Sequence, residues 1–277
     1  MTGVDTHVHI LRVGARLAAD RHSAPSRDTT VPELLALLDS RGLSHAVLTA
    51  PSFYGQDNSI LLEALAQGES RLLGTVAVAP GTSSAELSRL AGAGVCGIRF
   101  NLLSRAGTSL AFSSAQQALF ARAAEAGLHV ELLAEAAAIQ ALARPVLAAG
   151  AVLVLDHFGL AAAADHAARA FVLETLEGGS TWVKLSAPYR LPSFDAAAEW
   201  ARTLAAHRPD RLLWGSDWPW VSHEHHGYSY PSTLDWLADW VPDEPTRRSI
   251  LVGNPSRLLG LGAPTPQRSE RAKEIFR

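Results

Sequence analysis

The sequence is poor in cysteine, in long hydrophobic runs and in basic clusters. Cys96 is the only cysteine among 277 residues, which excludes an internal disulfide and any metal site that needs two or four thiolates. Apolar runs such as residues 151–155 are far too short to cross a bilayer. The net charge is −3 and no long basic run is present, so neither a nucleic acid nor an anionic membrane is favoured as a partner.

The first ten residues also lack the basic start and the apolar stretch of a secretory signal peptide. A hydrophobic content of 48% with 18% charged residues is ordinary for a globular enzyme with a substantial core. We therefore expect a cytoplasmic protein. Nothing in the sequence indicates its oligomeric state.

Short apolar runs of strand length recur along the chain. They cover residues 4–9, 45–50, 72–79, 96–102, 128–133, 152–156, 182–186 and 212–215. Their length and their β-branched content are typical of strands buried on both faces. Between them lie Ala/Leu/Glu/Arg stretches with helical spacing, such as "VPELLALLDSRG" and "SAQQALFARAAEAG", which end at a glycine.

Eight alternations of strand and helix predict a single-domain (β/α)₈ TIM barrel of the α/β class over residues 1–262. Residues 263–277 leave the pattern and are expected to form a tail or a terminal helix. An open doubly wound sheet is the alternative, but it usually carries a glycine-rich turn after its first strand. This chain has "THVHI" there instead.

Polar side chains gather at the predicted carboxyl ends of the strands, where the chemistry of such barrels lies. His7 and His9, two residues apart on the first strand, project to the same face. The later strand ends and the loops after them carry Ser52, Tyr54, Asp57, Asn58, Arg99, Asn101, Arg105, His129, Glu131, Asp156, His157, Lys184, Ser186, Tyr189, Arg190 and Asp217. The strand starts are mostly apolar, and this asymmetry predicts a site at one mouth of the barrel.

Several of these residues also have a structural interpretation. His157 could cap a turn, Asp217 could be a helix N-cap, and Arg99 could form an ion pair with Glu131. The segment "SHEHHGYSY" at 222–230 could cover a substrate, or it could be a solvated loop. A barrel mouth at which all of these residues are merely structural is the less favoured interpretation.

Together, "VDTHVHI", "VLDHFG" and "LLWGSDWP", in this order, resemble the amidohydrolase superfamily. "APSFYGQDN", "GVCGIRFNLL", "VKLSAPYR" and "ILVGNPSRLLG" are similar to its branch of pyrone dicarboxylate lactonases. The resemblance covers residues 4 to about 262. It implies that His7, His9 and His157 surround the scissile carbonyl, and that Asp217 is the general base.

The resemblance further implies that Arg99 and Arg105 bind a substrate carboxylate, with Ser52, Tyr189 and Arg190 as further substrate contacts. The substrate expected from it is a small anionic lactone from aromatic or sugar-acid breakdown. The lactonase branch usually has a histidine after "SDWP", whereas Trp220 stands here, which leaves the exact substrate open.

Either no metal or one divalent metal, Zn²⁺ or Mn²⁺, fits these residues. The histidines could polarise the carbonyl directly, or His7, His9, His157 and Asp217 could hold the ion. A binuclear centre is not expected, because the position of a bridging lysine or glutamate on the fourth strand is filled by Arg99. A decarboxylase or another hydrolase of the same superfamily is one alternative function, and a catalytically inactive barrel that binds an anionic metabolite is another.

Overall fold

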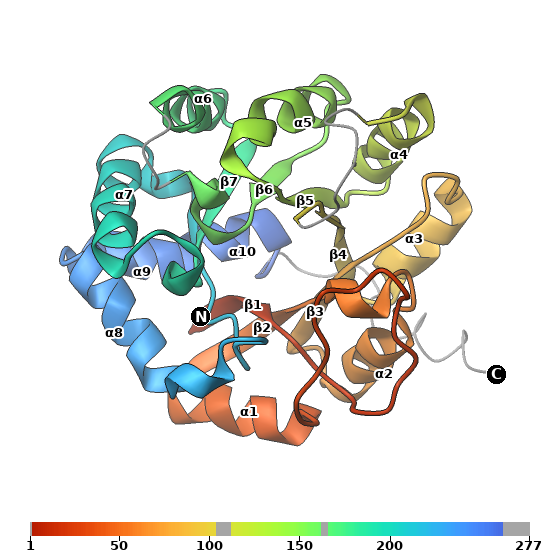
Figure 1. The fold of residues 1–277 in the computed structure, drawn as a ribbon, viewed down its shortest axis with the longest axis horizontal. Coiled ribbons are helices and arrows are strands. Elements are labelled where there is room, and N and C mark those ends of the chain that lie inside the picture. Colours follow the sequence, from red (N-terminus) through yellow and green to blue (C-terminus); the bar gives the residue numbers. More distant parts are fainter. Residues whose placement is uncertain (1, 104–111, 162–165, 263–277) are drawn as a thin grey trace.

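The computed structural model describes residues 2–103, 112–161 and 166–262. Eight parallel strands lie side by side in chain order (Figure 1). They are β1 (Gly3–Val8), β2 (Leu43–Thr49), β3 (Leu72–Val76), β4 (Val95–Asn101), β5 (His129–Leu133), β6 (Leu153–Leu155), β7 (Thr181–Leu185) and β8 (Leu212–Trp214). The predicted TIM barrel is therefore confirmed. The proposed tail, residues 263–277, lies outside the described residues.

Helices surround the strands (Figure 1). They are α1 (Val31–Ser40), α2 (Ser59–Gln67), α3 (Ser84–Gly92), α4 (Ser114–Glu125), α5 (Ala136–Ala148), α6 (His166–Glu177), α7 (Phe194–His207), α8 (Tyr230–Trp240), α9 (Glu244–Arg248) and α10 (Asn254–Leu259). Hydroxyl side chains cap several of them: Thr30, Ser83 and Ser113 each accept a backbone hydrogen bond from the third residue of the helix that follows. Within the described ranges, no helix has the length and apolar character needed to span a membrane.

The first and last strands meet at the carboxyl end of the barrel. The backbone N–H of Asp217 donates to the carbonyl oxygen of His7 at 2.9 Å, and the N–H of His9 donates to that of Trp218, also at 2.9 Å. These two bonds nearly close the barrel. They also bring the residues after β8 next to the two histidines of β1.

The opposite end of the barrel is closed by apolar side chains. Val4, Val47 and Leu73, on three neighbouring strands, form a buried cluster with Leu259 of α10, which lies behind the barrel centre in Figure 1. Polar side chains occupy the carboxyl end.

Candidate active site

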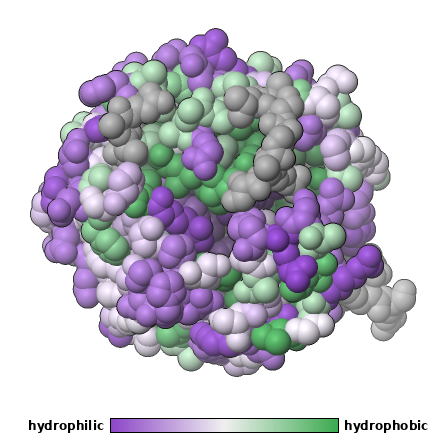
Figure 2. Space-filling model, in the orientation of Figure 1, coloured by the Kyte–Doolittle hydropathy of each residue, from purple (hydrophilic) through white to green (hydrophobic). Residues whose placement is uncertain are grey.

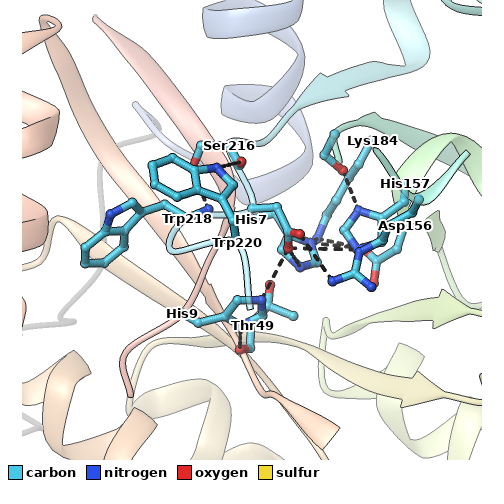
Figure 3. Close-up of polar contacts among 12 residues, drawn as sticks. His7, His9, Thr49, Asp156, His157, Lys184, Ser216, Trp218 and Trp220 are labelled. Atoms are coloured by element: carbon cyan, nitrogen blue, oxygen red, sulfur yellow. Dashed lines mark hydrogen bonds and ion pairs between the residues drawn. The ribbon is translucent and has the colours of Figure 1, made fainter. Parts of the chain in front are cut away.

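Four side chains predicted from the strand ends come together at the mouth (Figure 3). The Nε2 atoms of His7 and His9 both lie 3.4 Å from Asp217 Oδ1, and His157 Nε2 lies 4.0 Å from the same oxygen. All four residues are buried. Three imidazole nitrogens thus point at one carboxylate oxygen.

Two of these residues are held in an unusual backbone conformation. His157 follows β6 with φ of 48°, and Asp217 follows β8 with φ of 57°. Non-glycine residues rarely adopt this left-handed region, and strain of this kind costs about 1–3 kcal/mol per residue. The surrounding structure therefore stabilises a backbone that turns both side chains inward.

Asp5, which the sequence analysis did not single out, fixes β1 to the segment after β8. Its Oδ1 accepts hydrogen bonds from the backbone N–H groups of His7 at 3.1 Å and Ser216 at 3.0 Å, and its Oδ2 accepts one from the Tyr230 hydroxyl at 2.7 Å. Gly215 allows the segment after β8 to lie close to His7 of β1, because a Cβ on residue 215 would lie 2.6 Å from His7 Cβ. This carboxylate therefore helps to set the positions of His7 and Asp217.

The two oxygens of Asp217 have different surroundings. The Tyr189 hydroxyl donates to Oδ2 at 2.6 Å, and Arg190 Nη2 donates to it at 3.4 Å. Oδ1 is buried and accepts no hydrogen bond. Burial disfavours the charge, but Arg190 and His157 outweigh it and hold the pKa of Asp217 well below its usual range. The carboxylate is therefore ionised at neutral pH.

Each histidine uses its Nδ1 atom for a contact within the protein. His9 Nδ1 lies 2.7 Å from the Thr49 carbonyl oxygen, and His157 Nδ1 lies 2.8 Å from Ser186 Oγ. Because a carbonyl can only accept, His9 Nδ1 is the donor, so a neutral His9 has its lone pair at Nε2. Burial lowers the pKa of His7 to about 4 and that of His157 well below its usual range, so both are neutral at pH 7.

The same atoms fit a single metal ion. Ligand atoms of His7, His9 and Asp217 lie within 4.8 Å of one another, and a second set of His7, Asp156 and His157 overlaps with the first. His7 Nε2 and Asp217 Oδ1 are buried without a hydrogen-bond partner. Imidazole and carboxylate ligands suit Zn²⁺. A histidine that binds zinc usually donates its other ring N–H to a protein acceptor, as His9 Nδ1 does to the Thr49 carbonyl oxygen.

Next to this cluster lies a buried network of charged side chains from the ends of β4 to β7. Lys184 Nζ lies 2.5 Å from Glu131 Oε2 and 3.2 Å from Asp156 Oδ1. Burial opposes the charge of Lys184, but Asp156 and Glu131 outweigh it and raise its pKa. Burial likewise opposes charge on the two carboxylates, yet the cations lower both of their pKa values. All three side chains are therefore charged.

Arg99 belongs to this network. Its Nε lies 3.0 Å from Asp156 Oδ2 and 3.2 Å from Glu131 Oε1, and its Nη1 donates to the Ala50 carbonyl at 3.0 Å. The ion pair with Glu131, left open as an alternative, is thus present. Ser52 begins a short turn after β2 and is half-buried, and Arg105 lies outside the described residues.

The segment 222–230 stacks against the site. The ring of Tyr189 lies 4.5 Å from that of His223 and 4.9 Å from that of Tyr228, centroid to centroid. Since the Tyr189 hydroxyl binds Asp217, this loop forms one wall beside the carboxylate. Figure 2, in the same orientation as Figure 1, shows a central hollow with hydrophilic residues at its sides and hydrophobic residues above it.

Fold and site together define a (β/α)₈ barrel with a histidine–aspartate cluster at its carboxyl mouth. A family model for amidohydrolases matches residues 4–261, and the chain belongs to that family.

Two characterised relatives and one solved structure are similar over nearly the whole chain. The 4-sulfomuconolactone hydrolase of Hydrogenophaga intermedia is 30% identical over 275 residues, which cover 92% of this chain and 88% of the relative. The 2-pyrone-4,6-dicarboxylate hydrolase of Comamonas testosteroni is 28% identical over 273 residues, which cover 92% and 89%. A crystal structure of a probable 2-pyrone-4,6-dicarboxylic acid hydrolase from Acinetobacter baumannii, with citric acid bound, superposes with a TM-score of 0.87 at 28% identity, covering 94% of this chain and all of that one.

Proposed function

We propose that the protein hydrolyses the ring ester of a small carboxylated lactone, with Asp217 as the general base. The observation that carries this proposal is the convergence of three imidazole nitrogens, from His7, His9 and His157, on the unpartnered Oδ1 of Asp217. An ionised carboxylate and several polar N–H groups in one buried site are what ester hydrolysis requires.

The reaction then runs as follows. Asp217 Oδ1 takes a proton from a water molecule as the water oxygen attacks the lactone carbonyl carbon. An imidazole N–H of His7 or His157 donates to the carbonyl oxygen as it gains negative charge. The ring C–O bond breaks, and the leaving ring oxygen takes the proton back from Asp217. The product is an open-chain hydroxy acid.

One divalent ion is compatible with this scheme. His7, His9, His157 and Asp217 would hold it, and when bound it would polarise the carbonyl and lower the pKa of a coordinated water molecule to about 7.

The substrate's negative charge is assigned to arginine side chains. The named relatives act on a sulfonated lactone and a dicarboxylated pyrone, both anionic, and a planar guanidinium suits a carboxylate. We assign carboxylate binding to Arg105 and Arg99, with Ser52, Tyr189 and Arg190 as further contacts. Arg99 already pairs with Asp156 and Glu131, so its replacement should also destabilise the fold.

Arg105 therefore gives the cleaner test. Arg105→Met should lower kcat/KM about ten- to a hundredfold on a carboxylated lactone, because a hydrogen bond to a charged group contributes about 1.5–3 kcal/mol. On a neutral lactone of the same ring size the loss should be much smaller. Arg89→Met, at an exposed arginine of α3 that pairs with Glu86, is the matched control and should change neither rate. Equal losses of Arg105→Met on both lactones would contradict the anionic substrate.

A further inference from the structure

The ammonium group of Lys184 has three acceptors around it. They are Glu131 Oε2 at 2.5 Å, Asp156 Oδ1 at 3.2 Å and His7 Nδ1 at 3.2 Å. A lysine ammonium has three N–H donors and no acceptor. Where Lys184 meets His7, the lysine must therefore donate and the ring nitrogen must accept.

Asp156 competes for the same nitrogen, because its Oδ1 also lies 3.2 Å from His7 Nδ1. A bond to this carboxylate would require the proton to be on Nδ1. The geometry favours the lysine: Lys184 Nζ and His7 Nδ1 form a hydrogen bond, whereas Asp156 Oδ1 lies near both groups as an ion-pair partner and forms a hydrogen bond with neither. The single proton of a neutral His7 is then on Nε2, the atom that lies 3.4 Å from Asp217 Oδ1.

We propose that, in the metal-free enzyme, Lys184 is a positioning residue, which holds His7 in the tautomer protonated at Nε2, so that His7 donates to the carbonyl oxygen of the substrate; a metal bound at Nε2 would require the opposite tautomer. This inference rests on the proposed hydrolysis. His9 is held in the opposite tautomer by the Thr49 carbonyl, which leaves a lone pair on its Nε2. The two histidines of the "HVH" motif thus have different tasks: His7 stabilises the developing oxyanion, and His9 accepts a hydrogen bond from the attacking water.

The direct test is long-range ¹H–¹⁵N NMR of histidine-labelled protein at pH 8, with the His7 signals identified by their loss in His7→Gln. In the wild-type protein, His7 should show an unprotonated Nδ1 and a protonated Nε2, and His9 the reverse. A wild-type His7 protonated at Nδ1 would overturn the inference, whatever the variants do.

The Lys184→Met variant provides a second test of the tautomer. Its His7 Nδ1 should gain a proton, because Asp156 Oδ1 is the partner that remains. Loss of one oxyanion donor should lower kcat by ~10²–10³-fold, with KM changed much less. The His9 signals, set by Thr49, serve as the internal control.

Arg99→Met is the matched variant, since it removes one positive charge from the same buried network without touching the bond between Lys184 and His7. Its His7 Nδ1 should stay unprotonated, and protonation in this variant would show that network charge, not Lys184, sets the tautomer. The NMR result is independent of any substrate. If the tautomers are as proposed but no lactone is opened, the proposed function fails and the tautomer assignment stands.

Discussion

The hydroxyl of Tyr189 lies 2.6 Å from Asp217 Oδ2, while Asp217 Oδ1 has no hydrogen-bond partner. The tyrosine anchors one oxygen of the carboxylate and leaves the other facing the three imidazoles. The site thereby combines a fixed orientation of the carboxylate with a free oxygen at which a proton can be accepted.

Tyr189→Phe should therefore lower kcat by about ten- to a hundredfold, since a hydrogen bond to a charged group contributes about 1.5–3 kcal/mol. The measurement is steady-state kinetics, with circular dichroism to confirm the fold. Tyr228→Phe is the matched control: its ring stacks on that of Tyr189 at 4.9 Å, and we expect its rate to be unchanged. Equal losses in the two variants would contradict an anchoring role for the Tyr189 hydroxyl.

The free energy of unfolding should fall as the pH is lowered from 6.5 to 4. Burial lowers the pKa of His7 from 6.5 to about 4, so the unfolded chain binds a proton in this window that the folded protein excludes. The contribution of His7 is fully present above pH 6.5, and the loss reaches about 3 kcal/mol by pH 4. Burial also lowers the pKa of His157, so this histidine likewise lowers the free energy of unfolding as the pH falls.

Urea unfolding at several pH values tests this dependence. The fall in stability between pH 7 and pH 4 should be smaller in His7→Gln than in the wild-type protein, whatever the absolute stability of the variant. An identical pH dependence in both proteins would show that His7 is not the group that titrates.

Elemental analysis of the purified protein should find at most one tightly bound divalent ion per chain. Among the described residues, both sets of side chains that could hold an ion include His7, and they therefore overlap. On the fourth strand, Arg99 stands in place of a bridging ligand and is paired with two carboxylates. Two ions per chain that resist dialysis would contradict this assignment.

Much of the fold could be predicted because buried parallel strands leave a clear signal. The eight apolar runs correspond to the eight strands, mostly within one or two residues. The run at 72–79 is the exception, because β3 ends at Val76. The next backbone N–H, that of Ala77, bonds to the side chain of Asn58 at 3.1 Å and not to a neighbouring strand. Hydrophobicity alone does not reveal such a switch of partner.

The position of His7, His9, His157 and Asp217 at strand ends could likewise be predicted, since carboxyl ends of parallel strands meet at one mouth. The residues that hold these four side chains in place could not be predicted. Lys184 lies between Val183 and Leu185, and a charge in so apolar a strand signals a buried ion pair, but not with which residue. Asp5 was missed because a single carboxylate next to the histidines gives no sign that it bonds to Ser216 and Tyr230, more than 200 residues away.

The central claim is that the protein hydrolyses a lactone ring with one water molecule, from which Asp217 removes a proton. Mass spectrometry of the product formed from a carboxylated lactone in H₂¹⁸O tests it most directly. We expect a product heavier than the substrate by one molecule of H₂¹⁸O, with one ¹⁸O in the new carboxylate. The Asp217→Asn variant should still bind the substrate, but its kcat should be ~10²–10⁴-fold lower than that of the wild-type protein. A product that has lost CO₂, or an Asp217→Asn variant with near wild-type kcat, would contradict it.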